Sequence, residues 1–454
     1  MSNKIKNNSL DNTIYIKNLI DERKKYNKKK KTKKILIVSL SILLIILIGL
    51  LIYYLDKEHK EQIKLDNIQK EQEIVNNIKS HYNSYVITNK ESNLYNSNYE
   101  VIGIIGNDVE LSLEESEINK DTKYFKIKDF EDIYIKYDDV DVINGLGSYD
   151  DRYKNYIVFN ENIVTNDKTL FYDENNNLIY SFNKSYDFPI IIKDTDKYGI
   201  EFNNRLLYIL SSDVKEIKYN YNTDKSNTTG VGVFNYHAFY DENNSEERKN
   251  CNTAICHSKA QFKTHLDYFK EHNYLTLKMK ELEDYMDGKI QLPKSILITI
   301  DDGPKTEHAI NMLTEYKMYA TIFLVTSWFD PATYYKTDYI ELHSHGHNLH
   351  NGGDCPGGQG GAIKCLEKTK LLEDLKESSR VLGGSKYFCY PFYEYNSYSI
   401  SVLKEAGYTM AFAGEYGDML AKKTTNKYII PRFVIMTHTT ISDIDSYLNQ
   451  IKYY

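Results

Sequence analysis

Several features that would point to common classes of protein are missing from this chain of 454 residues. Neither sign of charge is in large excess, because 57 Lys and Arg stand against 64 Asp and Glu, so nothing indicates nucleic-acid binding. The five cysteines form no Cys-x-x-Cys repeat, which argues against a structural zinc site. The glycine-rich segment 352–361 lacks the Lys-Ser/Thr pair of a phosphate-binding loop. The length allows about two to four domains.

A long apolar run lies near the N-terminus. Residues 35–55 are 21 residues without a charge, and at about 1.5 Å per residue they can span a hydrocarbon core of about 30 Å. Nine Lys and Arg between positions 23 and 34 precede this run. By the positive-inside rule we predict a cytoplasmic tail over 1–34, a membrane helix over 35–55 and an extracellular remainder. A cleaved signal peptide is the alternative, but Tyr53-Tyr54-Leu55-Asp56 offers no small-residue cleavage site.

The region between the apolar run and position 221 consists of two parts that differ in amino-acid composition. Residues 56–84 are charged and lack Gly and Pro, which predicts a helical stalk whose self-association stays open. Short runs of Ile, Val, Tyr and Phe between Asn, Asp and Gly then predict two small β domains, over 85–148 and 149–221. Segments 124–140 and 198–214 share an aromatic strand, a second strand and a final Asp-Val, and they resemble bacterial Src-homology-3-like barrels. Both contact with wall polymers and a spacer role remain open.

Two adjacent carboxylates and a cluster of histidines carry the chemistry. The apolar residues 296–298 lead into Thr299-Ile300-Asp301-Asp302-Gly303-Pro304, and about forty residues later come His343, His345, His347 and His350. Alone, Asp-Asp-Gly is most often a turn, and a His-rich stretch is often a solvated loop. Together they indicate a divalent-metal hydrolase, because one carboxylate can bind the metal while its neighbour accepts a proton from water.

These motifs resemble the polysaccharide deacetylase family, also called the NodB-homology or carbohydrate esterase family 4 domain. Its first motif reads Thr-Phe-Asp-Asp-Gly, and here Ile300 replaces the Phe. The resemblance implies that Asp301 is the catalytic base and Asp302 a metal ligand. The family implies a divalent ion, zinc by preference, with cobalt or nickel as alternatives.

The second family motif fits this sequence in two registers. His345 with His350 resembles the biofilm poly-N-acetylglucosamine deacetylase branch, through Ser344-His345 and Asn348-Leu349-His350, and we favour it. The other register pairs His343 with His347, which otherwise either support the metal ligands from behind or are exposed. One Asp with two His leaves coordination positions for water and a substrate carbonyl.

The remaining motifs supply candidates for the acid and for the groove. In the biofilm branch a Tyr-His follows the opening strand, which implies His237 as general acid, since imidazole with a pKa of about 6.5 can protonate a leaving amine. His438, in the ordinary family order, is the alternative, and a structural role is open for either. Pro391 and Phe392, in the place of the third motif, are expected to form one wall of the groove.

The third motif departs from the family pattern. Phe388-Cys389-Tyr390-Pro391-Phe392 has a cysteine where the family has an arginine that braces the base. Arg432 is one candidate to supply the brace from elsewhere, and a surface position is its alternative. Local disulfides are expected to join Cys251 with Cys256 and Cys355 with Cys365, because an extracellular domain permits them.

Helical and strand-like runs alternate after position 229. Helical patterns over 258–272 and 306–316 flank strand-like runs over 296–300 and 319–325, which predicts an α/β fold. The family resemblance implies an irregular (β/α) barrel of about seven strands over 229–454, with the site at the carboxyl ends of its strands.

The function implied by the resemblance is metal-dependent N-deacetylation of an extracellular polysaccharide, with release of acetate. Peptidoglycan N-acetylglucosamine is the favoured substrate, since free amines would add positive charge to the cell wall and reduce lysozyme cleavage. Exported poly-N-acetylglucosamine is the alternative glycan. A wall-binding protein that has lost activity is the alternative of a different class.

Overall fold

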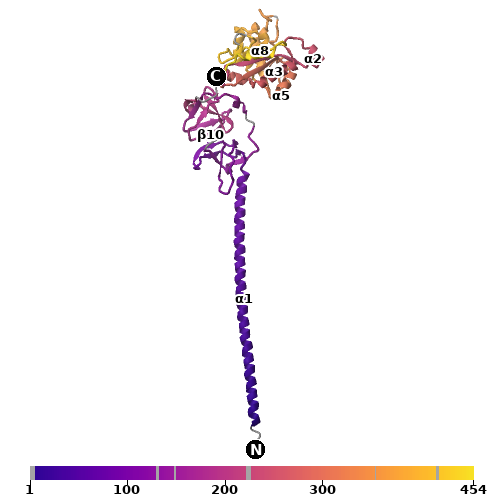
Figure 1. Ribbon diagram of the computed structural model, residues 1–454. Helices are drawn as coiled ribbons and strands as arrows, with labels where there is room; N and C mark the ends of the chain where they lie inside the picture. The colour runs from indigo at the N-terminus through magenta and orange to yellow at the C-terminus, as the bar shows by residue number, and fades with distance from the viewer. Residues whose placement is uncertain are drawn as a thin grey trace. The chain divides into compact units, whose positions relative to one another are not determined.

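The computed structural model describes residues 6–128, 132–147, 150–220, 226–352, 354–415 and 419–453. It opens with α1 (Lys6–Ser80), which Figure 1 shows as one continuous helix. A fully exposed 18-residue window of α1 has a mean hydropathy of 3.3. Its length and apolar composition suggest a single-pass membrane anchor. The direction of insertion and the stalk role of residues 56–84 stay predictions.

The chain divides into two compact units. The first contains α1, the residues up to Tyr82 and the segment Ser116–Lys123. The second contains Asn83–Glu115 and the chain from Tyr124 onward. Both β-rich stretches and the motif-bearing region belong to this second unit.

Short antiparallel strands make up the first part of the second unit. Their bounds are β1 (Tyr85–Thr88), β2 (Ser92–Tyr95), β3 (Val101–Ile105), β4 (Glu110–Ser112), β5 (Tyr124–Lys126), β6 (Tyr134–Lys136), β7 (Val140–Val142), β8 (Glu161–Thr165), β9 (Thr169–Tyr172), β10 (Leu178–Phe182), β11 (Asp187–Pro189), β12 (Ile192–Lys193), β13 (Lys197–Phe202), β14 (Arg205–Leu210) and β15 (Val214–Tyr219). Three 3-10 turns accompany them: η1 (Tyr137–Asp139), η2 (Arg152–Asn155) and η3 (Ser211–Asp213).

These strands form one large sheet and two small ones. The large sheet has the order β12-β13-β14-β9-β10-β3-β2-β6-β5, and the small sheets are β4-β1-β7 and β11-β8-β15. Both look-alike segments contain two strands, a 3-10 turn and a further strand. The pairing of β3 with β10 carries the large sheet across the predicted boundary between 148 and 149. The division into two Src-homology-3-like barrels therefore stays a prediction.

The motif-bearing region alternates strands and helices. Its strands are β16 (Val231–Tyr236), β17 (Ala238–Tyr240), β18 (Cys256–Ser258), β19 (Leu275–Thr276), β20 (Ser295–Asp302), β21 (Ala320–Leu324), β22 (Ile340–Ser344), β23 (Tyr387–Cys389), β24 (Met410–Phe412), β25 (Leu420–Ala421) and β26 (Phe433–Val434). Its helices are α2 (Ser245–Lys249), α3 (Lys259–Glu271), α4 (Met279–Met286), α5 (Glu307–Tyr316), α6 (Lys368–Val381), α7 (Ser397–Glu405) and α8 (Ile441–Leu448), with 3-10 turns η4 (Ala362–Lys364) and η5 (Pro391–Tyr393).

A parallel half-barrel carries the site. Strands β16, β20, β21, β22, β23 and β24 pair in parallel in this order, and β26 pairs in parallel with β16. Central β20 is buried except at its last residue, as a continuous apolar run in a parallel sheet should be. An α/β half-barrel confirms the coarse form of the predicted fold. Observed α3, α5, β20 and β21 lie within two residues of the predicted runs.

Helix ends and disulfides follow local sequence. Asn396 caps α7 and Thr440 caps α8, each in a capping box that satisfies backbone N–H groups of the first turn. Disulfides join Cys251 to Cys256 and Cys355 to Cys365, as expected, and Cys389 is a buried free thiol. The four bonded cysteines are thus not thiolate ligands for a metal.

A buried ion pair joins the β-rich part to the half-barrel within the second unit. Arg152 of η2 donates through Nε to Glu281 Oε1 at 2.6 Å and through Nη2 to the same carboxylate. Arg152 also donates to the Thr276 carbonyl at 3.0 Å, and Tyr156 donates to Glu281. Both charged side chains are nearly inaccessible, at 11% and 6% exposure. Each charge therefore depends on the other for compensation.

Substitution of Arg152 by methionine should destabilise this unit, because it leaves the Glu281 carboxylate buried without its cation. The expected loss is about 3 kcal/mol, visible as a melting temperature several degrees lower in a thermal scan followed by circular dichroism. The matched control is Lys154→Met in the same turn, where the side chain is exposed. Equal melting temperatures for the two variants would contradict a stabilising role for the pair.

Candidate active site

Two neighbouring carboxylates mark the carboxyl end of β20. Asp302 ends the strand with a φ of 73°, a left-handed conformation that is uncommon outside glycine. Gly303 follows at φ 116°, and a Cβ there would lie 2.6 Å from Leu324 Cδ1, so the turn requires glycine. Asp301 is buried while Asp302 is partly exposed. The turn thus gives two adjacent aspartates different surroundings.

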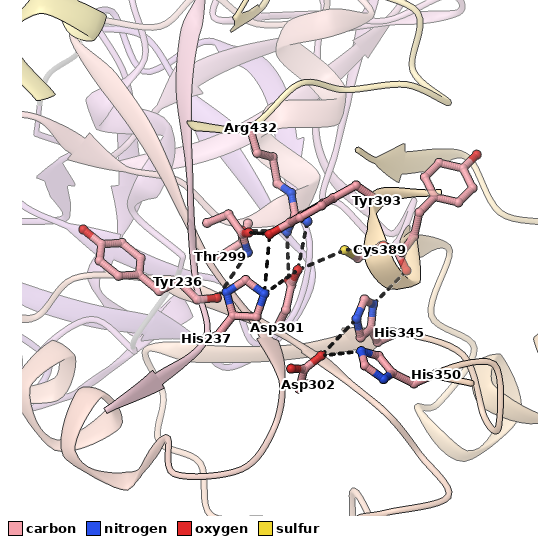
Figure 2. A network of polar contacts seen from close by, with 12 residues as sticks. Tyr236, His237, Thr299, Asp301, Asp302, His345, His350, Cys389, Tyr393 and Arg432 are labelled. Atoms are coloured by element: carbon pink, nitrogen blue, oxygen red, sulfur yellow. Dashed lines mark hydrogen bonds and ion pairs between the residues drawn. The ribbon is translucent and has the colours of Figure 1, made fainter. Parts of the chain in front are cut away.

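Asp302 meets two histidines from the loop after β22. Its Oδ1 lies 3.2 Å from His345 Nε2 and 3.1 Å from His350 Nε2. Figure 2 shows the three side chains pointing toward one another. Asp302 Oδ1 is buried and has no hydrogen bond of acceptable geometry among the described residues. The three ligand atoms of Asp302, His345 and His350 lie within 4.8 Å of one another and lack hydrogen-bonding geometry. Atoms that bind one common metal ion are arranged in this way.

The two imidazoles are held in place by further contacts. His345 Nδ1 donates to the Cys389 carbonyl at 2.8 Å, which leaves the Nε2 lone pair free to face Asp302. The His350 ring lies between two aromatic rings, with centroid distances of 5.0 Å to Trp328 and 4.5 Å to Phe392. Neither imidazole has to reorient to act as a metal ligand.

The chemistry of this donor set fits a divalent ion. One carboxylate and two imidazoles suit first-row divalent metals such as zinc, and they leave coordination positions for water and substrate. Burial raises the pKa of the Asp302 carboxyl, but the imidazoles of His345 and His350 close to it outweigh burial and hold that pKa below its ordinary value. Asp302 is therefore ionised and available as an anionic ligand.

Asp301 is braced by a buried arginine. Arg432 Nη1 donates to Asp301 Oδ1 at 2.8 Å and Nη2 donates to Oδ2 at 2.9 Å, and its Nε donates to the Ala413 carbonyl. Burial raises the pKa of Asp301, but the charge and hydrogen bonds of Arg432 act in the opposite direction, and the pKa lies below its ordinary value. Arg432 is fully buried rather than on the surface. A bidentate pair of this kind fixes both the charge and the direction of the carboxylate.

Cys389 lies against the same carboxylate. Its thiol donates to Asp301 Oδ2 at 3.4 Å, and burial raises the pKa of the thiol, so it stays protonated. Asp301, His345 and Cys389 also form a compact set of metal-ligating atoms. That set fits an ion less well than Asp302 with the two histidines, because Arg432 already neutralises Asp301 and the thiol holds its proton.

A third histidine completes the cluster from the end of β16. His237 Nε2 lies 4.0 Å from Asp301 Oδ2 and 3.5 Å from the Tyr393 hydroxyl (Figure 2). Tyr393 donates its proton to Asn235 Oδ1 at 2.6 Å. Burial lowers the pKa of His237, although the charges of Asp301 and Asp302 act in the opposite direction. The tyrosine oxygen can therefore accept from a neutral His237 that carries its proton on Nε2.

The part of the chain that carries these residues matches a known protein family. Residues 289–411 match the family model described as polysaccharide deacetylase. The chain carries a polysaccharide deacetylase domain. The family description names a hydrolytic activity, deacetylation, which confirms the predicted enzyme class.

Curated relatives of the deacetylase domain agree with this assignment. A poly-beta-1,6-N-acetyl-D-glucosamine N-deacetylase of Staphylococcus aureus is 29% identical over 200 residues, which cover 39% of this chain and 67% of the relative. The enzyme of the same name from Staphylococcus epidermidis is 26% identical over 209 residues, which cover 38% of this chain and 66% of the relative.

Some solved structures are also similar to this chain. A de-N-acetylase of Aggregatibacter actinomycetemcomitans is 22% identical, with a TM-score of 0.42 and coverage of 48% of this chain and 99% of that chain. A polysaccharide deacetylase of Bacillus cereus is 17% identical, with a TM-score of 0.39 and coverage of 74% and 99%.

The other candidate residues of the deacetylase domain lie elsewhere or in supporting positions. His343 Nδ1 is 2.9 Å from Ser385 Oγ, and burial lowers the pKa of His343 to about 3. His347 Nδ1 is 3.0 Å from Thr326 Oγ1. His438 is exposed on a segment that follows β26. Among the four clustered histidines, the structure brings His345 and His350 together with Asp302.

Two residues in the cluster are not evident from the sequence. Asn235 precedes Tyr236-His237 and reads only as part of a buried strand. Tyr393 follows Pro391 and Phe392, and both aromatic residues have a positive φ, at 57° and 59°. Consecutive non-glycine residues in this conformation are strained and concentrate at functional sites. That strain is a signal of the folded backbone, so the sequence alone does not contain it.

Proposed function

We propose that this chain is a metal-dependent N-deacetylase of an extracellular N-acetylated polysaccharide and that it releases acetate. The observation that carries the proposal is the convergence of Asp302, His345 and His350 beside a second carboxylate, Asp301, which Arg432 holds ionised. The family match and the names of the curated relatives support it. Metal binding by these three residues is part of the proposal.

The two aspartates would divide the work. A divalent ion held by Asp302, His345 and His350 would polarise an acetamide carbonyl and make a water molecule easier to deprotonate. Asp301 would accept the proton of the attacking water, and its Oδ2 lies 4.0 Å from His237 Nε2. Arg432 would keep Asp301 ionised until it accepts this proton and would fix the direction of its carboxylate.

His237, charged as the imidazolium, would give its Nε2 proton to the leaving amine and become neutral, and the proton that Asp301 takes from water would then restore the charge of His237. Its Nε2 faces Asp301 and the Tyr393 hydroxyl, and Tyr393 donates to Asn235, so the tyrosine oxygen holds a proton on Nε2. A proton at that atom is directed into the site, where the carbon–nitrogen bond would break. We assign Tyr393 and Asn235 to the orientation of His237.

The proposed glycan is a polymer of N-acetylglucosamine. The curated relatives are named for poly-beta-1,6-N-acetyl-D-glucosamine, which favours a β-1,6-linked chain for this enzyme. Peptidoglycan strands are the candidate that follows from the sequence. The apolar run at 35–55, with basic residues before it, would hold the domain on the outer side of the membrane, next to the wall.

Acetate release from defined glycans tests this proposal. The purified full chain would be incubated with zinc, cobalt or nickel and with either β-1,6-linked N-acetylglucosamine oligomers or peptidoglycan strands, and free acetate would be measured. Faster release from the β-1,6 oligomers supports the β-1,6-linked polymer as substrate, and faster release from peptidoglycan supports the candidate inferred from sequence. Absence of release from every glycan, in protein shown to contain metal, would refute the enzymatic function.

Replacement of each of two histidines separates the candidate acids. His237→Ala should lower kcat about a hundredfold, because it removes the proton donor next to Asp301. His438→Ala is the matched control and should change kcat less than about twofold, since that side chain is exposed. A large loss in the His438 variant with an active His237 variant would reverse the assignment.

A further inference from the structure

The single tryptophan of this chain lies exposed at the edge of the candidate active site. Trp328 is 48% exposed, although tryptophan has the largest apolar side chain. Among the described residues from 226 to 453, the other exposed large aromatic side chains are Tyr335 and Tyr453. The Trp328 ring contacts the candidate metal ligand His350 at a centroid distance of 5.0 Å. Packing in the core does not explain why about half of this indole faces water.

The backbone around Trp328 is fixed to the segment that carries the histidines. Thr326 N donates to the Gly346 carbonyl at 3.1 Å, and Ser327 N donates to the His347 carbonyl at 2.9 Å. Trp328 N closes the turn by donating to the Val325 carbonyl at 3.0 Å. The indole is therefore held at a defined place relative to the histidine segment, and it needs little ordering when a ligand arrives.

The shape and chemistry of this platform suit a sugar ring. A pyranose of the N-acetylglucosamine type presents an apolar face of C–H groups, which can stack on the electron-rich face of an indole. A polymer extends beyond the unit that reacts, so a neighbouring unit must lie close to the metal ligands. Trp328 offers an exposed aromatic face at that distance, adjoining His350.

We propose that Trp328 forms a stacking subsite for the sugar unit next to the one that is deacetylated. This inference rests on the proposed function, because it takes the ligand to be a chain of N-acetylated sugars. The subsite selects oligosaccharides over monosaccharides. It acts on binding and leaves the chemical step to Asp301 and His237.

Intrinsic fluorescence provides a direct test, since every photon from tryptophan comes from Trp328. The full chain carrying Asp301→Asn, loaded with zinc, would be titrated with a β-1,6-linked N-acetylglucosamine pentamer and, separately, with the monosaccharide. We expect saturable quenching or a blue shift with the pentamer and a much smaller change with the monosaccharide. No spectral change with the pentamer, when equilibrium dialysis shows that it binds, would overturn the subsite.

Kinetics on the active enzyme supply an independent readout. Trp328→Ala should raise KM for the pentamer about tenfold, with metal content per chain measured alongside, and Trp328→Phe, which keeps a ring at this position, should recover part of the loss. Tyr453→Ala is the control, because Tyr453 is an exposed aromatic residue far from the site. Its backbone pairs with Thr228, which precedes β16, whereas His237 follows the other end of that strand. An unchanged KM in Trp328→Ala would refute the subsite and leave the proposed function standing, whereas no acetate release by the unmodified chain would refute the proposed function itself.

Discussion

Substitution of Asp301 by asparagine should lower acetate release about a thousandfold while the chain still binds its divalent ion. Asparagine keeps the shape of the side chain but cannot accept the proton of the attacking water. It also leaves the buried Arg432 without its anionic partner, so a lower melting temperature is expected alongside the loss of activity. The measurement pairs kcat with metal content per chain after dialysis.

The adjacent aspartate provides the contrast. Asp302→Asn should lose both metal and activity, because it weakens a ligand rather than the base. Asp338→Asn, at an exposed position in the same domain, should change neither quantity. If Asp301→Asn lost its metal while Asp302→Asn kept it, the roles of the two carboxylates would have to be exchanged.

The residue types of the site were predictable from the sequence, but their arrangement was not. Asp-Asp-Gly after an apolar run places two carboxylates at the end of a buried strand, and the parallel sheet with β20 at its centre puts them there. Which histidines approach Asp302 depends on the turn at Gly346, where φ is 86°. The sequence contained both registers and no physical reason that excluded one of them.

The brace on Asp301 shows a further limit of sequence reasoning. Cys389 stands in the place of the family's arginine, and the guanidinium comes instead from Arg432, which follows β25 and precedes β26. Two elements far apart in the chain meet there because β26 pairs with β16 beside β20. A contact of this kind is set by sheet closure, which local patterns do not encode.

The β-rich part of the chain contains both local hairpins and long-range strand pairs. Hairpins such as β13–β14 were predictable, because Asn203 and Asn204 supply two consecutive positive φ angles between alternating strands. The pairing of β3 with β10 was not, since it joins strands that lie in separate predicted domains. Long-range strand pairing leaves little trace in composition or periodicity.

The four clustered histidines allow the most discriminating test of the metal site. His345→Ala and His350→Ala should each lower metal affinity on the order of a thousandfold and bring acetate release close to background. The reason is geometric, since their Nε2 atoms lie 3.2 Å and 3.1 Å from Asp302 Oδ1. Metal content by atomic absorption and acetate release would be measured on the same preparations, before and after chelation and metal return.

The two remaining histidines are controls of the same residue type in the same short segment. His347→Ala should keep metal and activity within about twofold, because His347 contacts Thr326 instead of Asp302. His343→Ala should lower the melting temperature, since it removes a side chain that bonds Ser385 and packs edge-on against Tyr387, while metal content stays unchanged. Loss of metal in these two variants, with metal retained in the His345 and His350 variants, would establish the alternative register. It would also show that His345 and His350, which lie next to Asp302, are not the metal ligands.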